Sequence, residues 1–383
     1  MPPRPANFSL ESCWRNLVAR RCFWSWLVFP LLWLLSLPWW LVVCASHHIY
    51  RLGIRKPRTA LLPVVSVGNI SVGGSGKTTA CMYLARKLAQ SGVVAGIVLR
   101  GYKRTSRGAV LVSDGRELLA TVEQAGDEAW LLANRLPGCP VAVAQRREAA
   151  VALLAQDAAA QLVLLDDGFQ YYRLARQVDL VLLDAYTPPG SHHLFPAGLL
   201  REPYSHLTRA SDVWITHSDI ASDRQLAQAE RIARRYAPQA PVVVTSHALD
   251  RLTTWQGTAV PSDLLHTHPA VAVAGIGNPE AFFSLVQELG GRPAICLAFP
   301  DHHAYSFGDW DTIAASAAGD ENTVVVTTPK DAVRMPEPPA YLDVYVLHPT
   351  LKVEAGEAAM PELLQRLCAL ARSVPSAAGE VLR

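Results

Sequence analysis

The chain has 383 residues, enough for two ordinary α/β domains that each have their own hydrophobic core. Its formal net charge is only +2, so the charge balance gives no reason to expect a nucleic acid partner. The seven cysteines are odd in number and include no Cys-x-x-Cys pair. This pattern argues against a disulfide framework or a structural zinc site, and it favours a reducing compartment.

An uncharged stretch rich in Trp, Leu and Val covers residues 22–45. It is long enough to cross a bilayer, and it is too long for a cleavable signal peptide. Basic residues flank it on both sides, so the positive-inside rule assigns no orientation. Because Pro30 and Pro38 interrupt the segment, a monotopic or re-entrant anchor competes with a single span. Either form predicts an association with the membrane bilayer.

A β-branched run at 64–69 leads into a glycine-rich turn that opens directly into a helix. This order is typical of a phosphate-binding P-loop, in which backbone N–H groups converge on phosphate oxygens at a helix N-terminus. Lys77 is expected to reach the β- and γ-phosphates, and Thr78 to offer its hydroxyl to Mg²⁺. Ser71 replaces the first glycine of the usual motif. The predicted nucleotide-binding residues are Ser71, Val72, Gly73, Gly74, Ser75, Gly76, Lys77, Thr78 and Thr79.

Buried strands alternate with helices along the rest of the chain, which predicts two α/β domains, the first with a P-loop NTPase-type parallel sheet. The expected strands are 92–99, 140–144, 162–165, 179–184, 212–216, 242–245, 270–275, 294–299, 323–328 and 342–347. An Arg- and Ala-rich helix at about 222–236 marks the boundary between the domains. The expected divisions are an N-terminal membrane anchor at 1–58, a P-loop kinase domain at 59–220, a second α/β domain at 221–372 and a flexible tail at 373–383.

Polar residues follow several of these strands, at the edge where open α/β sheets bind their ligands. Arg100 and Tyr102 follow the strand at 92–99 and are well placed for this purpose. Asp127 and Glu128 lie at the start of a predicted helix. From their spacing alone, these two acids are best interpreted as complementing the helix dipole.

The strand at 162–165 runs directly into Asp166 and Asp167. Four apolar residues followed by acid match a Walker-B element, whose carboxylate holds or positions Mg²⁺ beside a P-loop. Gln170 follows in the same turn and can either ligate the metal or orient a nucleophile. The pattern alone is an ordinary strand-to-turn transition, so the interpretation depends on the P-loop upstream.

Two later segments offer further polar groups. The loop at 186–203 is rich in Pro, Gly and His and is a candidate lid or acceptor-site loop, in which Arg201 can stabilise charge on a transferring phosphoryl group. His302 stands next to Asp301 at the end of another strand. A histidine beside a carboxylate can relay a proton, although a structural loop histidine is the better interpretation from the sequence alone.

Together these motifs resemble those of the tetraacyldisaccharide 4'-kinases of lipid A biosynthesis. The resemblance covers nearly the whole chain in order and includes the hydrophobic N-terminus. Ser71 also looks like this family's own version of the loop, in which Ser or Thr precedes Val-Gly-Gly. The matching segments are 67–78, 100–102, 126–128, 166–170, 200–203, 299–303 and 330–332.

The resemblance implies an ATP-dependent lipid kinase that phosphorylates the 4'-hydroxyl of a tetraacyldisaccharide 1-phosphate, giving lipid IVA. It places the catalytic domains on the cytoplasmic face of the inner membrane and implies no obligate protein partner. It also implies that Asp127 is the general base, with His302 rather than His303 as its partner from the second domain. The phosphate and substrate candidates are Lys77, Arg100, Tyr102, Arg147 and Arg201. The Mg²⁺ candidates are Thr78, Glu128, Asp166, Asp167 and Gln170.

A membrane-tethered P-loop ATPase that works as a switch or a transport motor is the alternative from another class. It shares the P-loop and the anchor with the kinase. It differs in consuming ATP without phosphorylating a lipid acceptor.

Overall fold

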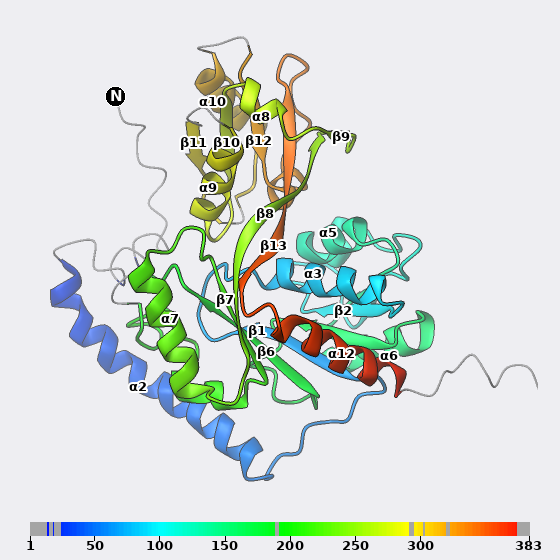
Figure 1. Ribbon diagram of the computed structural model, residues 1–383, viewed down its shortest axis with the longest axis vertical. Coiled ribbons are helices and arrows are strands. Elements are labelled where there is room, and N and C mark those ends of the chain that lie inside the picture. The colour runs from blue at the N-terminus through cyan, green and yellow to red at the C-terminus, as the bar shows by residue number, and fades with distance from the viewer. Residues whose placement is uncertain are drawn as a thin grey trace, which may run out of the picture.

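The computed structural model describes Trp14, Val18 and residues 24–187, 191–290, 295–301, 303–318 and 322–373. These residues form an α/β fold with one large sheet, which Figure 1 shows as a lower and an upper unit joined by two long strands. The strands are β1 (Val64–Asn69), β2 (Ala95–Leu99), β3 (Val110–Ser113), β4 (Val141–Val143), β5 (Leu162–Asp166), β6 (Val178–Asp184), β7 (Asp212–Thr216), β8 (Val242–Thr254), β9 (Ala259–Val260), β10 (Ala270–Ala274), β11 (Ile295–Ala298), β12 (Val324–Thr327) and β13 (Val344–Ala355).

Helices cover both faces of this sheet, and most of them connect two successive strands of the chain. The helices are α2 (Trp24–Arg51), α3 (Lys77–Gln90), α4 (Val122–Ala125), α5 (Asp127–Arg135), α6 (Arg147–Asp157), the 3-10 helix η1 (Tyr204–Arg209), α7 (Asp223–Tyr236), α8 (Leu264–Thr267), α9 (Pro279–Gly290), α10 (Phe307–Ala317), α11 (Pro329–Ala332) and α12 (Ala359–Arg372).

The strands of the lower unit are buried on both sides, which explains why they read as unbroken apolar runs. Side chains alternate between the two faces of a strand. Val65 and Leu164 therefore pack beneath α3 and α12, whereas Val64 and Val163 pack against α6 on the opposite face. The strand order is β11-β10-β12-β13-β8-β7-β6-β1-β5-β2-β4-β3, and β1 lies parallel to both β5 and β6. This order brings the carboxyl ends of β1 and β5 together.

Strands β8 and β13 are longer than the sequence predicts, because each begins or ends in one unit and continues into the other. β8 starts parallel to β7 in the lower unit and then pairs antiparallel with β13 over most of its length. Helices α7 and α12 follow residue 220 in the chain, yet they pack against the cores that contain β6 and β7 or β1 and β5. The division of the chain near residue 220 therefore remains a proposal.

The apolar N-terminal stretch forms one continuous helix, α2, which passes through both Pro30 and Pro38. The sequence predicted an interruption at these prolines, because each removes a backbone donor and crowds the preceding turn, but the helix continues through both. Leu27–Arg51 is long and apolar enough to cross a membrane, and only 6% of its most apolar stretch is buried in the protein. Figure 1 shows α2 in blue along the outside of the lower unit.

Candidate functional site

A cavity of about 460 Å³ opens beside the glycine-rich turn, between the two units. The lower unit lines it with residues 72–79 and with Glu128, Asp166, Asp167 and Arg201. The upper unit contributes the turn at 276–278 together with Asp301 and Lys330. Most of these residues lie at or just beyond the carboxyl ends of strands, the edge where open α/β sheets bind their ligands.

The glycine-rich turn is held in place by hydrogen bonds from two buried side chains, Asn69 and Thr216. The buried Asn69 amide donates to Ser75 Oγ at 2.7 Å, and the Thr216 hydroxyl donates to the Ser75 carbonyl at 3.2 Å. Gly76 has a φ of 80°, a left-handed conformation that glycine adopts without strain, immediately before α3 begins at Lys77. Ser71 lies just before the cavity-lining residues and forms a bridge with Leu200.

The acidic turn after β5 lies directly against β1. A Cβ on Gly68 would lie 2.5 Å from the Cβ of Phe169, so glycine at this position allows the close approach. The Thr78 hydroxyl, at the start of α3, consequently donates to Asp166 Oδ2 at 3.2 Å. The P-loop helix and the Walker-B-like turn thus meet at a hydroxyl and a carboxylate, the pair that P-loop enzymes use around Mg²⁺.

Asp166 and Asp167 have opposite electrostatic surroundings. Burial, reinforced by the Glu128 charge, raises the pKa of Asp166 to about 7. The second oxygen of this carboxylate, Oδ1, is buried and has no hydrogen-bond partner among the described residues. Asp167 instead accepts two hydrogen bonds from Arg201 at 2.9 and 3.0 Å and lies 3.5 Å from Lys77 Nζ. Burial opposes ionisation of Asp167, but these two cations outweigh it and lower its pKa.

Asp127 owes its position to a close turn of the chain. Gly126, with a φ of 84°, precedes α5, and a Cβ there would lie 2.9 Å from the Tyr102 carbonyl oxygen. Glycine therefore allows α5 to start beside the turn that carries Tyr102. In this arrangement the Glu128 backbone N–H donates to Asp127 Oδ1 at 3.0 Å.

Two cations of the upper unit face these two acids across the cleft. Lys330 Nζ donates to Glu128 Oε1 at 2.9 Å, and Arg334 Nε lies 3.8 Å from Asp127 Oδ2. Burial disfavours the Lys330 charge, but Glu128 and Asp301 outweigh it and raise the pKa of the lysine. Glu128 was predicted as a Mg²⁺ candidate, and here its carboxylate bonds a lysine.

One of these cations, Arg334, is held by the fully buried carboxylate of Asp331. Asp331 is 0% exposed, accepts from the Gly275 backbone N–H at 3.0 Å and accepts from Arg334 at 2.9 Å. Lys330 stood out in the sequence as part of the segment at 330–332 that resembles the family, whereas Arg334 was not predicted. Lys330 and Arg334 follow β12, so the strand-end rule used for Arg100 would have found this segment as well.

Other candidates lie away from the cavity or outside the described residues. Arg100 and Tyr102 are exposed at the end of β2, whereas Arg147 is buried with its guanidinium 4.7 Å from the centre of the Tyr171 ring. Gln170 donates to the Asn69 carbonyl at 2.8 Å. His302 falls outside the described residues, and its neighbour His303 lies 3.3 Å from Asp309.

We expect Lys330→Met to raise the KM for ATP about tenfold or more, the scale for losing a hydrogen bond to a charged group. Lys330 lines the cavity, and its loss would leave the carboxylates of Glu128 and Asp301 without this cation beside the site. Steady-state kinetics would measure the effect. Lys352→Met is the matched control, because Lys352 is exposed and pairs with Glu354. An unchanged KM in Lys330→Met would contradict the prediction.

These features define a P-loop nucleotide-binding enzyme whose site is shared by two α/β units. Residues 28–369 match the family model for tetraacyldisaccharide-1-P 4'-kinase, LpxK. The chain belongs to this family.

Individual relatives agree with this assignment. A tetraacyldisaccharide 4'-kinase of Anaeromyxobacter dehalogenans is 39% identical over 287 residues, covering 75% of this chain and 76% of that protein. One from Desulfatibacillum aliphaticivorans is 36% identical over 336 residues, covering 85% and 89%. The crystal structure of LpxK from Aquifex aeolicus in complex with ATP superposes with a TM-score of 0.68 at 29% identity, covering 87% of this chain and 97% of that one.

Proposed function

We propose that the protein transfers the γ-phosphoryl group of ATP to the 4'-hydroxyl of a tetraacyldisaccharide 1-phosphate, giving lipid IVA. The kinase class and the use of ATP follow from the family and from its ATP-bound structural relative. The observation that carries the mechanism is the meeting of Lys77, Thr78 and Asp166 at one cavity, with Asp127 at the adjoining helix start.

ATP would bind with its phosphates against the backbone N–H groups of residues 73–78 at the start of α3. Lys77 would lie against the β- and γ-phosphates, where its charge, now close to Asp167, would balance theirs. Arg201 would act on the transferring group in the same way, because its guanidinium already enters the cavity on the Asp167 side.

The chain's residues fit a Mg²⁺ ion at this cavity. The buried, unpartnered Asp166 Oδ1 is a hard oxygen ligand, and Thr78 stands beside it. The described residues contain no preformed group of three or more His, Cys, Asp or Glu side chains that would hold a metal. This agrees with a Mg²⁺ ion held by one or two protein oxygens and by substrate phosphates, which it would partly neutralise.

Asp127 would take the proton of the attacking hydroxyl. Its carboxylate lies at the start of α5, next to Glu128 of the cavity wall, and one of its oxygens is oriented by the Glu128 backbone N–H. In phosphoryl transfer the base has mainly to position the hydroxyl and accept its proton. His302 is the proposed partner of Asp127 in this proton transfer.

The lipid substrate and the apolar helix α2 both indicate that the enzyme acts at a membrane surface. A four-chain lipid is confined to the bilayer, because each buried CH₂ contributes about 0.8 kcal/mol. The exposed apolar face of α2 would hold the enzyme there, with the catalytic units on the cytoplasmic face of the inner membrane, where ATP is found.

The deciding experiment incubates the full chain with γ-labelled ATP and tetraacyldisaccharide 1-phosphate in mixed micelles. We expect label in the lipid product and little ATP consumption without the acceptor. Steady phosphate release without labelled lipid would instead support an ATPase that acts as a switch or motor. Acceptors with other sugars or acyl chains test the proposed substrate.

A further inference from the structure

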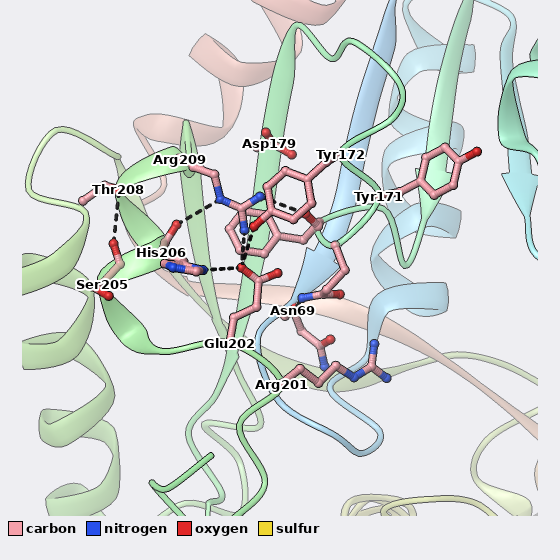
Figure 2. Close-up of polar contacts among 12 residues, drawn as sticks. Asn69, Tyr171, Tyr172, Asp179, Arg201, Glu202, Ser205, His206, Thr208 and Arg209 are labelled. Carbon is pink, nitrogen blue, oxygen red and sulfur yellow. Dashed lines mark hydrogen bonds and ion pairs between the residues drawn. The ribbon is translucent and has the colours of Figure 1, made fainter. Parts of the chain in front are cut away.

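The last turns of α2 lie against a polar cluster formed by the buried Glu202 and His206 and the half-buried Tyr172 and Arg209, which we call the Glu202 cluster. Figure 2 shows Tyr172, His206 and Arg209 gathered around the Glu202 carboxylate. Glu202 is 1% exposed, and its Oε2 accepts from His206 at 2.7 Å, from Tyr172 at 3.0 Å and from Arg209 at 2.6 Å. None of these residues lines the nucleotide cavity.

Helix α2 packs on this cluster through two aromatic stacks. The His47 ring lies 4.2 Å from the His206 ring, with 23° between their planes. The Tyr50 ring lies 5.4 Å from the Tyr172 ring, with 17° between the planes. His47 is buried, whereas the next residue, His48, is exposed on the same helix. One side of the C-terminal end of α2 is therefore fitted to the Glu202 cluster.

The cluster supports both partners of the ion pair at the cavity. Arg201, which pairs with Asp167, immediately precedes Glu202 in the chain. Arg209 lies with its guanidinium 3.8 Å from the centre of the Phe169 ring and donates to the Phe169 carbonyl at 3.1 Å. Phe169 belongs to the same turn as Asp167. The Glu202 cluster thus fixes the segment that carries the cation and the turn that carries its carboxylate.

A third contact joins α2 to Arg201 itself. The Trp39 indole N–H donates to the Arg201 carbonyl at 3.0 Å, while the Arg201 backbone N–H donates to the Ile70 carbonyl at 2.7 Å. The main chain of Arg201 is therefore held between α2 on one side and Ile70, which leads into the P-loop, on the other.

If the contact served only to attach α2 to the rest of the protein, it would not need the buried carboxylate of Glu202. Glu202 Oε1 and His47 Nδ1 are both buried without hydrogen-bond partners among the described residues. A buried charge costs free energy that a well-packed apolar contact avoids. A polar cluster is instead suited to fixing one geometry, because its hydrogen bonds are directional.

We infer that the contact of α2 with the Glu202 cluster is part of the active-site scaffold, with His47 and Trp39 as positioning residues for Arg201. Phosphoryl transfer then depends on the docked helix and not only on membrane attachment. This inference rests on the role proposed above for Arg201.

The test uses the full chain with ATP and detergent-dispersed tetraacyldisaccharide 1-phosphate. We expect His47→Ala to lower kcat about tenfold, the scale of coupling between contacting residues, with unchanged ATP binding and unchanged partition onto vesicles. His47→Phe keeps a flat ring against His206 and should restore kcat to within about twofold. His48→Ala is the matched control on the exposed side of α2 and should leave kcat unchanged.

A double-mutant cycle separates positioning from simple attachment. In an Arg201→Ala background, which alone should lower kcat strongly, His47→Ala should cause no further loss. Trp39→Phe keeps an aromatic ring but removes the indole N–H that bonds the Arg201 carbonyl, and it gives a second cycle if His47→Ala does not fold.

Full kcat in His47→Ala and Trp39→Phe would overturn the inference, as would an equal loss in the Arg201→Ala background. Unchanged kcat in Arg201→Ala alone would overturn both the inference and the role of Arg201. If the unmodified chain does not phosphorylate the lipid, the proposed function is wrong, and the inference that rests on it is overturned with it.

Discussion

Asp127→Asn is expected to lower kcat by about 10²- to 10⁴-fold, the usual contribution of a positioned general base. The amide keeps the size of the carboxylate and can still accept from the Glu128 backbone N–H, so the start of α5 should persist. It cannot take the proton of the sugar hydroxyl. ATP affinity should stay within about threefold of the unmodified protein, because the predicted loss is confined to the chemical step.

Single-turnover phosphorylation of the lipid and equilibrium ATP binding measure the two quantities separately. Asp157→Asn serves as the control, since Asp157 is an exposed carboxylate at the end of α6. Near-normal turnover in Asp127→Asn would remove Asp127 from the proposed role. A parallel loss of ATP binding would show that the substitution disturbs the nucleotide site instead.

Asp166→Asn is expected to raise the Mg²⁺ concentration needed for half-maximal activity by at least about tenfold, the scale for losing a charged ligand partner. In the unmodified protein this requirement should fall as the pH rises from about 6 to about 8. The reason is that Asp166, with a pKa raised to about 7 by burial and by Glu128, must lose its proton before it can bind the cation.

Glu128→Gln gives the matched test of this electrostatic account. Removing the Glu128 charge takes away one cause of the raised pKa of Asp166, so the pH dependence of the Mg²⁺ requirement should move to lower pH. The requirement itself should change less than in Asp166→Asn. A larger Mg²⁺ defect in Glu128→Gln than in Asp166→Asn would identify Glu128 as the main ligand and contradict the assignment.

Much of the architecture follows from local patterns in the sequence. The strand at 212–216 and the strand, turn and helix around Lys77 were predicted within a few residues, because buried parallel strands leave unbroken apolar runs. The lengths of β8 and β13 were not predicted. Their extensions, such as the one around Arg251, carry polar and apolar residues together, and the strands persist there through pairing with each other.

The sequence predicted the parts of the candidate site that are contiguous in the chain, but not the contacts between distant segments. Gly76, Lys77 and Thr78 lie together in the chain, so a motif can describe them. Asp127 and Arg334 are far apart in the chain and meet only because the β8 and β13 strands bring the upper unit over α5. No spacing rule encodes such a contact, since it depends on how the two units are placed.

The sequence by itself determined that the chain has a glycine-rich turn between a buried strand and a helix, an apolar N-terminal helix and an α/β fold, because each depends on residues that are neighbours in the chain. Only the tertiary structure decided which charges pair. It placed Lys330 on Glu128, Arg201 on Asp167 and His47 against His206, because long-range packing brings distant segments to one edge of the sheet. Helix α2 thereby lies next to the segment that carries Arg201, a relation that no stretch of the sequence records.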